Sequence, residues 1–179
     1  LGAFRDTLPE DDPRRAERYV CGDVNTSILR TQRGRTILLQ HDVVSPQPYS
    51  RRTKVVGTRG TFSDDPPRLW VDGLAEGKPA WQDAGPWLER FRHPLWKETA
   101  ALRERQDDPA HGMDLVMLYR LVQSLREGLE PDFNVYDAAA WSAPVALSTA
   151  SVAQGGTSQA FPDFTRGQWR NSGWGHRKP

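Results

Sequence analysis

The chain has 179 residues, of which 37% are hydrophobic and 26% are charged, and its mean hydropathy is -0.69. That length suffices for one domain with its own core, and seven Trp residues argue against disorder. A net charge of +1, a single cysteine and the absence of any apolar run of ~18 residues give no reason to expect a nucleic-acid partner, an intrachain disulfide, a cysteine-based zinc cluster or a membrane span.

The chain starts with Leu1-Gly2-Ala3, without an initiator Met or a signal-peptide pattern. We therefore expect that an upstream domain has been lost, with a trimmed or mature form as the alternative; the compartment, cytoplasmic or exported, stays open. Residues 1–18 are polar and contain two prolines, which favours a linker or a remnant of the upstream region. Residues 19–170 then form the domain, and residues 171–179 form a tail.

Two β-hairpins are predicted in the first half of the domain. Hydrophobic and polar residues alternate before the turn at 32–35, and a β-rich run follows at 36–40. A second pair of short β-rich runs, 53–56 and 61–62, flanks the turn at 57–60. Another strand is expected at 69–71. These successive hairpins predict an antiparallel sheet, and no βαβ pattern is present.

Helices are predicted in the second half. Residues 86–105 contain helical pieces separated at Pro94, with these buried candidates: Trp87, Phe91, Leu95 and Trp96. The strongest helix is 113–127, since its leucines recur every three and four residues. We expect Asp132 to cap a further helix that Pro144 kinks or restarts, and an extended tail to follow. The fold class is α+β: an open antiparallel sheet with flanking helices on one side.

Three clusters could carry binding chemistry. His41, Tyr49 and Arg51 lie on or beside a proline-stiffened segment and could hold sugar hydroxyls, although Tyr49 could simply pack at a sheet edge. His111 and Asp114 lie at a helix start, where Asp114 also favours the helix dipole. The third cluster is the aromatic tail at 162–169, which more often packs on its own domain.

Other chemistry is not indicated. No glycine-rich phosphate loop and no GxSxG motif occurs in the sequence, and the four histidines are not spaced as helix-borne metal ligands. We therefore expect no catalytic residue, no cofactor-binding residue and no metal ligand in this chain.

The motifs follow one another in a characteristic order. They are Val20-Cys21-Gly22-Asp23-Val24-Asn25-Thr26-Ser27, Gly34-Arg35-Thr36-Ile37-Leu38-Leu39-Gln40-His41-Asp42, Ser45-Pro46-Gln47-Pro48-Tyr49-Ser50-Arg51, Gly57-Thr58-Arg59-Gly60, Pro66-Pro67-Arg68, Gly112-Met113-Asp114, Tyr119-Arg120-Leu121, Val135-Tyr136-Asp137-Ala138-Ala139 and Pro162-Asp163-Phe164-Thr165-Arg166-Gly167. The ordered set resembles the C-terminal half of bacterial NAD-dependent α-N-acetylgalactosaminidases. These belong to the glucose–fructose oxidoreductase/inositol dehydrogenase (Gfo/Idh/MocA) superfamily.

The resemblance implies an N-terminal Rossmann domain that is absent from this chain, and a sheet that closes over a carbohydrate substrate and forms homo-oligomers. It implies that NAD in the full-length protein oxidises C3 of the sugar transiently, so that the C1 substituent is eliminated and water adds. Tyr49 becomes a sugar contact. Three departures from the family pattern, at Gln47, Asp65 and Ala110-His111, weaken the assignment of N-acetylgalactosamine.

The function that we expect is therefore that of a parent protein, an NAD-dependent glycosidase acting on terminal N-acetylhexosamine, whereas this chain alone should be inactive. A sugar dehydrogenase of the same superfamily is the first alternative; releasable NAD and net substrate oxidation would favour it. A non-catalytic dimerisation or sugar-binding module is the second alternative. We expect neither nucleic acid nor a membrane as a partner.

Overall fold

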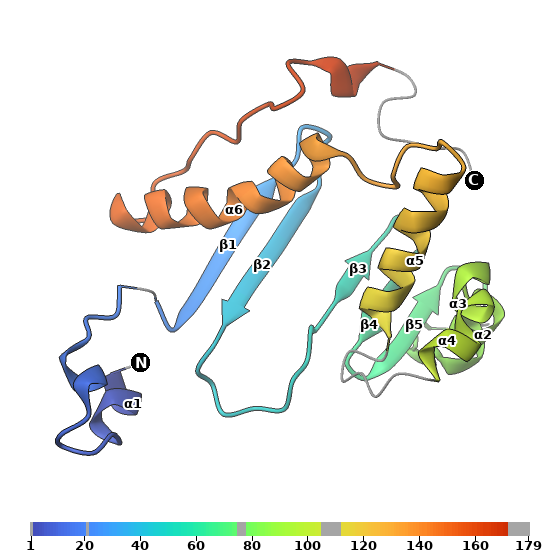
Figure 1. Ribbon diagram of the computed structural model, residues 1–179. Helices are drawn as coiled ribbons and strands as arrows, with labels where there is room; N and C mark the ends of the chain where they lie inside the picture. Colours follow the sequence, from blue (N-terminus) through green and yellow to red (C-terminus); the bar gives the residue numbers. More distant parts are fainter. Residues whose placement is uncertain (1, 21, 75–77, 105–111, 172–179) are drawn as a thin grey trace. The chain divides into compact units, whose positions relative to one another are not determined.

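The computed structural model describes residues 2–20, 22–74, 78–104 and 112–171. The chain divides into two compact units. One comprises Leu1–Gln47 with Asp132–Pro179, and the other comprises Pro48–Pro131. Each unit combines antiparallel strands with helices, so the α+β class expected from the sequence is confirmed (Figure 1).

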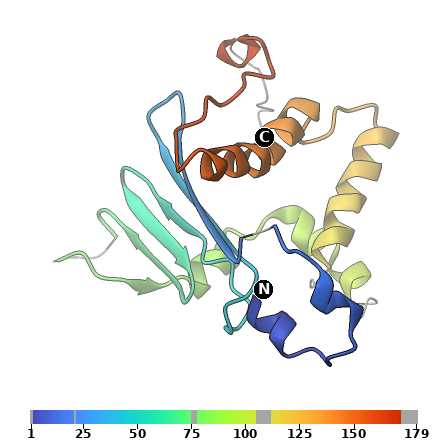
Figure 2. The same cartoon turned by 90° about the vertical axis from the view of Figure 1, so that its left-hand side faces the viewer.

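The first unit is built on a hairpin of β1 (Val24–Arg30) and β2 (Thr36–Asp42), as the alternation predicted. Its turn closes where the Gly34 N–H donates to the Thr31 carbonyl, with Gly34 in the left-handed region that a glycine adopts without strain. Helix α6 (Val135–Ala153) lies against this hairpin (Figures 1 and 2). Asn25, Ser27 and Leu29 are the half-buried residues of β1, whereas the residues between them are exposed.

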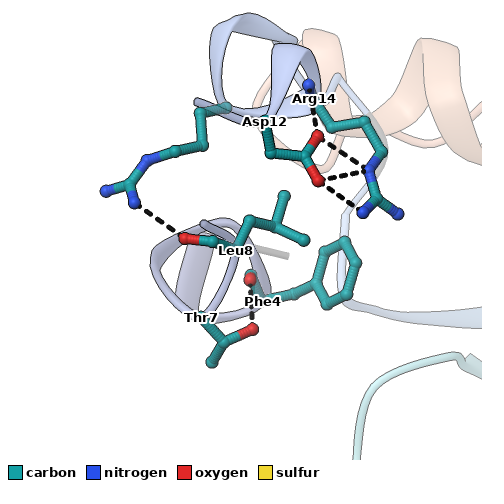
Figure 3. A network of polar contacts seen from close by, with 6 residues as sticks. Phe4, Thr7, Leu8, Asp12 and Arg14 are labelled. Carbon is teal, nitrogen blue, oxygen red and sulfur yellow. Dashed lines mark hydrogen bonds and ion pairs between the residues drawn. The ribbon is translucent and has the colours of Figure 1, made fainter. Parts of the chain in front are cut away.

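Residues 2–18, expected to be a linker, contain the short helix α1 (Gly2–Asp6) and the 3-10 helix η1 (Pro13–Ala16). Asp12 caps η1, because its carboxylate accepts bonds from the backbone and the guanidinium of Arg14 (Figure 3). The side-chain bond to Arg14 is the main reason that the pKa of Asp12 falls to about 2. Arg15 donates to the carbonyl of Leu8, a buried residue, so this segment has a defined local structure.

The second unit holds a four-stranded antiparallel sheet in the order of the chain: β3 (Lys54–Val56), β4 (Gly60–Asp64), β5 (Pro67–Val71) and β6 (Gln82–Asp83). The second predicted hairpin and the strand after it are therefore confirmed. Among the described residues the strands form two sheets and not one. The segment 45–48 between β2 and β3 contains two prolines, which cannot donate to a ladder, so strand pairing does not continue through this segment.

The described residues of the second unit also form four helices: α2 (Gly85–Arg90), α3 (Pro94–Glu98), α4 (Ala100–Arg103) and α5 (Met113–Arg126). Proline at the start of α3 separates it from α2, as expected. None of the four predicted buried residues is buried: Trp87, Leu95 and Trp96 are half-buried. Phe91 is 70% exposed and stacks on Trp87 with ring centroids 6.1 Å apart, so the prediction of burial was wrong. The fully buried residues here are instead small and polar: Thr99, the N-cap of α4, and Ser124 in α5.

Two expectations about the last helix are corrected. Asn134, and not Asp132, is the N-cap of α6, because its side chain accepts from the amides of Tyr136 and Asp137 while Asp137 bonds back to the Asn134 amide. This reciprocal arrangement is a capping box. Pro144 lies inside α6 without ending it, so the helix does not restart there, and the alternative of a kink stays a prediction.

The described residues bury few large apolar side chains; the buried hydrophobic ones are Leu8 and Ala84. The leucine stripe that predicted α5 stays half-exposed, with Leu118 at 52% and Leu125 at 64%. None of the described helices is both long enough and apolar enough to cross a bilayer. Because large apolar side chains are exposed in both units, each unit has apolar surface.

Candidate functional site

The candidate site is the segment 49–52, which directly precedes β3. The Arg51 Nε donates a hydrogen bond of 2.9 Å to the Tyr49 hydroxyl oxygen, so two of the predicted site residues are in contact. That hydrogen bond is the main reason that the pKa of Arg51 is raised, with a smaller contribution from the charge of Asp64. Arg51 therefore stays cationic at every physiological pH.

Hydrogen bonds to and within the segment hold it in place. The Ser50 hydroxyl donates to Asp65 Oδ2 at 2.6 Å, and the Arg52 amide donates to the Ser50 hydroxyl at 3.2 Å. Arg52 adopts a φ of 46°, a left-handed conformation that costs a non-glycine residue free energy. The Ser50–Asp65 bond joins the segment to the residue that follows β4. Asp65, one of the three departures noted in the sequence, therefore anchors this segment.

The Tyr49 hydroxyl can donate a hydrogen bond to a ligand. Tyr49 is 85% exposed, and its hydroxyl oxygen already accepts from Arg51, so the phenolic proton is free to donate to an acceptor on a ligand. The remaining guanidinium N–H groups of Arg51 lie beside it. Together they form a pair of adjacent donors suited to hydroxyl, carbonyl or carboxylate oxygens.

The other predicted contacts belong to other parts of the chain. His41 lies in β2 of the other compact unit, opposite Asn25, with an exposed side chain. Asp114 lies in the first turn of α5, exposed, where it favours the helix dipole. His111 lies outside the described residues. Among the residues described, no three His, Cys, Asp or Glu side chains gather as a metal site would require.

The predicted extended tail contains a tight turn instead. The carboxylate of Asp163 accepts four hydrogen bonds: from the amide and hydroxyl of Thr165, from the amide of Gly167 and from the indole of Trp169. Gly167 has a φ of 88°, and the 3-10 helix η2 (Gln168–Arg170) follows it. Sequence reasoning missed this turn, although Asp-Phe-Thr is a pattern typical of side-chain-to-backbone turns.

We expect the Asp163 turn to be insensitive to pH down to about 4 and to open below that. The Thr165 hydroxyl bond is the main reason that the pKa of Asp163 lies below its ordinary 3.8. A lowered pKa means that the carboxylate's contribution is complete above 3.8 and is lost as the pH falls through the folded-state value. The indole N–H resonance of Trp169, followed by NMR, should stay constant from pH 7 to about 4.

Asp163→Asn is the matched variant. Its amide nitrogen cannot accept from Gly167 and Trp169, so the Trp169 resonance should be shifted at every pH and should lose its acid transition. A Trp169 resonance that titrates near pH 6 in the parent protein would show that Asp163 does not control the turn.

The fold and the site define an α+β module that offers hydrogen-bond donors from a fixed segment beside an antiparallel sheet. The chain belongs to the family "Glycosyl hydrolase 109, C-terminal domain", whose sequence model matches residues 2–171. It is 48% identical over 166 residues to a glycosyl hydrolase family 109 protein of Solibacter usitatus, covering 93% of this chain and 37% of that relative.

Two further relatives bear the same description. The protein from Shewanella amazonensis is 45% identical over 168 residues, covering 92% of this chain and 36% of its own length. The protein from Saccharopolyspora erythraea is 43% identical over 172 residues, covering 95% and 36%. The chain thus spans little more than a third of the length of the curated relatives that it matches.

Proposed function

We propose that this chain is the C-terminal, sugar-facing part of an NAD-dependent glycosidase that hydrolyses terminal N-acetylhexosamine, with α-N-acetylgalactosamine as the first candidate. The proposed route is transient oxidation at C3 followed by elimination and addition of water. The observation that carries the proposal is the membership of residues 2–171 in a glycosyl hydrolase family whose curated members are much longer. The motif order from residue 20 to residue 167 supports the finer assignment.

The N-termini of the two longest helices, α5 and α6, do not fit the pyrophosphate of NAD. A dinucleotide pyrophosphate favours a helix N-terminus with free amides and a close glycine approach. Helix α5 has the carboxylate of Asp114 in its first turn, and the first amides of α6 already donate to Asn134 beside the carboxylate of Asp137. Both N-termini thus carry a negative charge where a pyrophosphate would have to bind. The proposal therefore assigns NAD to the part of the longer protein outside residues 1–179.

The share of the activity that this chain contributes is to bind and orient the sugar. Tyr49 and Arg51 can donate together to a ring hydroxyl or to the carbonyl oxygen of the N-acetyl group. The bond from Ser50 to Asp65 fixes the backbone between Tyr49 and Arg51, so less conformational entropy is lost when the sugar binds. Self-association through the sheet is part of the proposal, because the hairpin of β1 and β2 exposes Ile28 and Leu38.

The experiment uses the full-length protein with p-nitrophenyl α-N-acetylgalactosaminide and no added NAD. We expect p-nitrophenol release with NAD still bound after desalting, because the cofactor is regenerated within each turnover. In D₂O the freed sugar should carry one deuterium at C2, since elimination removes the proton there. Release without C2 deuterium would exclude the elimination route but keep a hydrolase. Net oxidation of the sugar without p-nitrophenol release would instead establish the dehydrogenase.

A further inference from the structure

The outward face of α6 carries no charged residue. The helix has 19 residues, and its one charged side chain is the capping Asp137. Half-buried positions recur along one side, at Ala140, Ala143, Leu147 and Ala150. From residue 138 onward the exposed positions form the opposite side, which we call the α6 outer face: Ala138, Trp141, Ser142, Val145, Ala146, Thr149, Val152 and Ala153.

This composition is not that of a helix that borders water. A helix on the surface of a soluble protein carries charged and polar residues opposite its core stripe, whereas a helix that is hydrophobic all round is buried. On the α6 outer face, Trp141 and Val152 are each 66% exposed and Val145 is 74% exposed. These three residues follow one another at intervals of four and seven, so they form one stripe along the helix.

The α6 outer face also has the features of an interface centre. Phe133, which precedes the helix, contacts Trp141 with ring centroids 5.3 Å apart, so an aromatic pair stands at the N-terminal end of the stripe. The capping box of Asn134 and Asp137 fixes the backbone at that end. Aromatic anchors on a rigid, uncharged surface are typical of contacts that are fully desolvated and permanent.

We infer that the α6 outer face is the docking surface for the N-terminal portion of the same, longer polypeptide. The family is a C-terminal domain, and the curated relatives extend far beyond the 37% or less of their length that aligns with this chain. A partner in the same polypeptide is present in every molecule at a high effective concentration. An uncharged face, which lacks charges that would keep it in water, needs a partner that is always present. The second copy expected in an oligomer has a separate apolar surface, the Ile28 and Leu38 face of the hairpin.

This inference rests on the proposed function only in taking the chain as part of a longer protein, and its test does not read activity. In the full-length protein, three cysteine variants are labelled with N-ethylmaleimide and quantified on their own peptides by mass spectrometry. Val145→Cys probes the α6 outer face, Ala143→Cys probes the face toward the hairpin, and Gln32→Cys probes an exposed turn. We expect Val145→Cys to react at least about tenfold more slowly than Gln32→Cys, as Ala143→Cys should, at every protein concentration.

The occupant is identified by photo-crosslinking from the thiol introduced by Val145→Cys, in a mixture of isotopically light and heavy protein. The expected products join residue 145 to peptides that precede residue 1, within one isotopic form. The inference would be overturned if residue 145 were labelled as fast as Gln32→Cys, or if its protection grew with protein concentration. Cross-links between light and heavy copies, or cross-links confined to residues 1–179, would overturn it as well. An inactive protein with a protected residue 145 would refute the proposed function alone.

Discussion

Gly60→Ala is expected to destabilise the four-stranded sheet by about 1–3 kcal/mol, the range typical of inserting a methyl group into a packed site. A Cβ at residue 60 would lie 2.8 Å from the carbonyl oxygen of Trp70 and 3.4 Å from a methyl carbon of Val71. Gly60 begins β4 and pairs with Val71 of β5, so the obstructing atom belongs to backbone that a side-chain rotation cannot move. The two strands would have to separate, which lengthens the ladder bonds at this end.

Gly57→Ala is the matched control, because Gly57 lies at the other end of the same turn. A Cβ there would meet the Gly60 carbonyl oxygen at 3.5 Å, an ordinary contact. We expect its free energy of unfolding to stay within about 1 kcal/mol of the parent value, with any change toward stabilisation because alanine restricts the unfolded chain. Urea unfolding followed by tryptophan fluorescence measures both variants. Equal midpoints for the two would show that β4 and β5 do not approach as closely as the structure has them.

The two hairpins were predictable because their information is local. Alternating residues and a glycine-containing turn specify β1 with β2, and β3 with β4, within stretches of about 20 residues or fewer. The division into two sheets was less visible, since it depends on how far pairing extends past the prolines at 46 and 48. The strand β6, of two residues, has no periodicity that a sequence pattern could reveal.

Burial was harder to predict than helix position. The leucine stripe placed α5 to within a residue or so, yet Leu118 and Leu125 are more than half exposed, while Thr99 and Ser124 are fully buried. Periodicity identifies an apolar face but not the partner that covers it, and such a partner need not lie within the same 179 residues. The α6 N-cap was missed because Asp132 and Asn134 are both good caps, and only backbone geometry distinguishes them.

The sequence placed Tyr49 and Arg51 together but did not reveal the contacts that support them, and their role at a sugar stays a prediction. The proline-flanked motif pointed to Tyr49 and Arg51, and the structure joins them at 2.9 Å. The bond that anchors them links Ser50 to Asp65 across 15 positions, which no local pattern encodes. His41 belongs to the other compact unit, so its place at a site with Tyr49 stays a prediction.

Tyr49→Phe is expected to lower kcat/KM of the proposed full-length glycosidase by roughly 3- to 10-fold, since one hydroxyl hydrogen bond contributes about 0.5–1.5 kcal/mol. The bound NAD content should not change, because the hydroxyl lies on a segment that we assign to the sugar. Arg51→Ala should lower kcat/KM by about tenfold or more, because it removes charge-assisted donors as well as the bond that orients the Tyr49 oxygen.

The double variant tests whether the two residues act as one unit. Because Arg51 orients the hydroxyl that Tyr49→Phe removes, the combined loss should be smaller than the product of the two single losses. Tyr119→Phe is the matched control, since the Tyr119 hydroxyl donates to Glu98 between α5 and α3 and has no proposed role at the sugar. Its kcat/KM should stay within about twofold of the parent value. Full multiplicativity of the Tyr49 and Arg51 losses would refute the pairing, and an unchanged Tyr49→Phe enzyme would remove the hydroxyl from the sugar site.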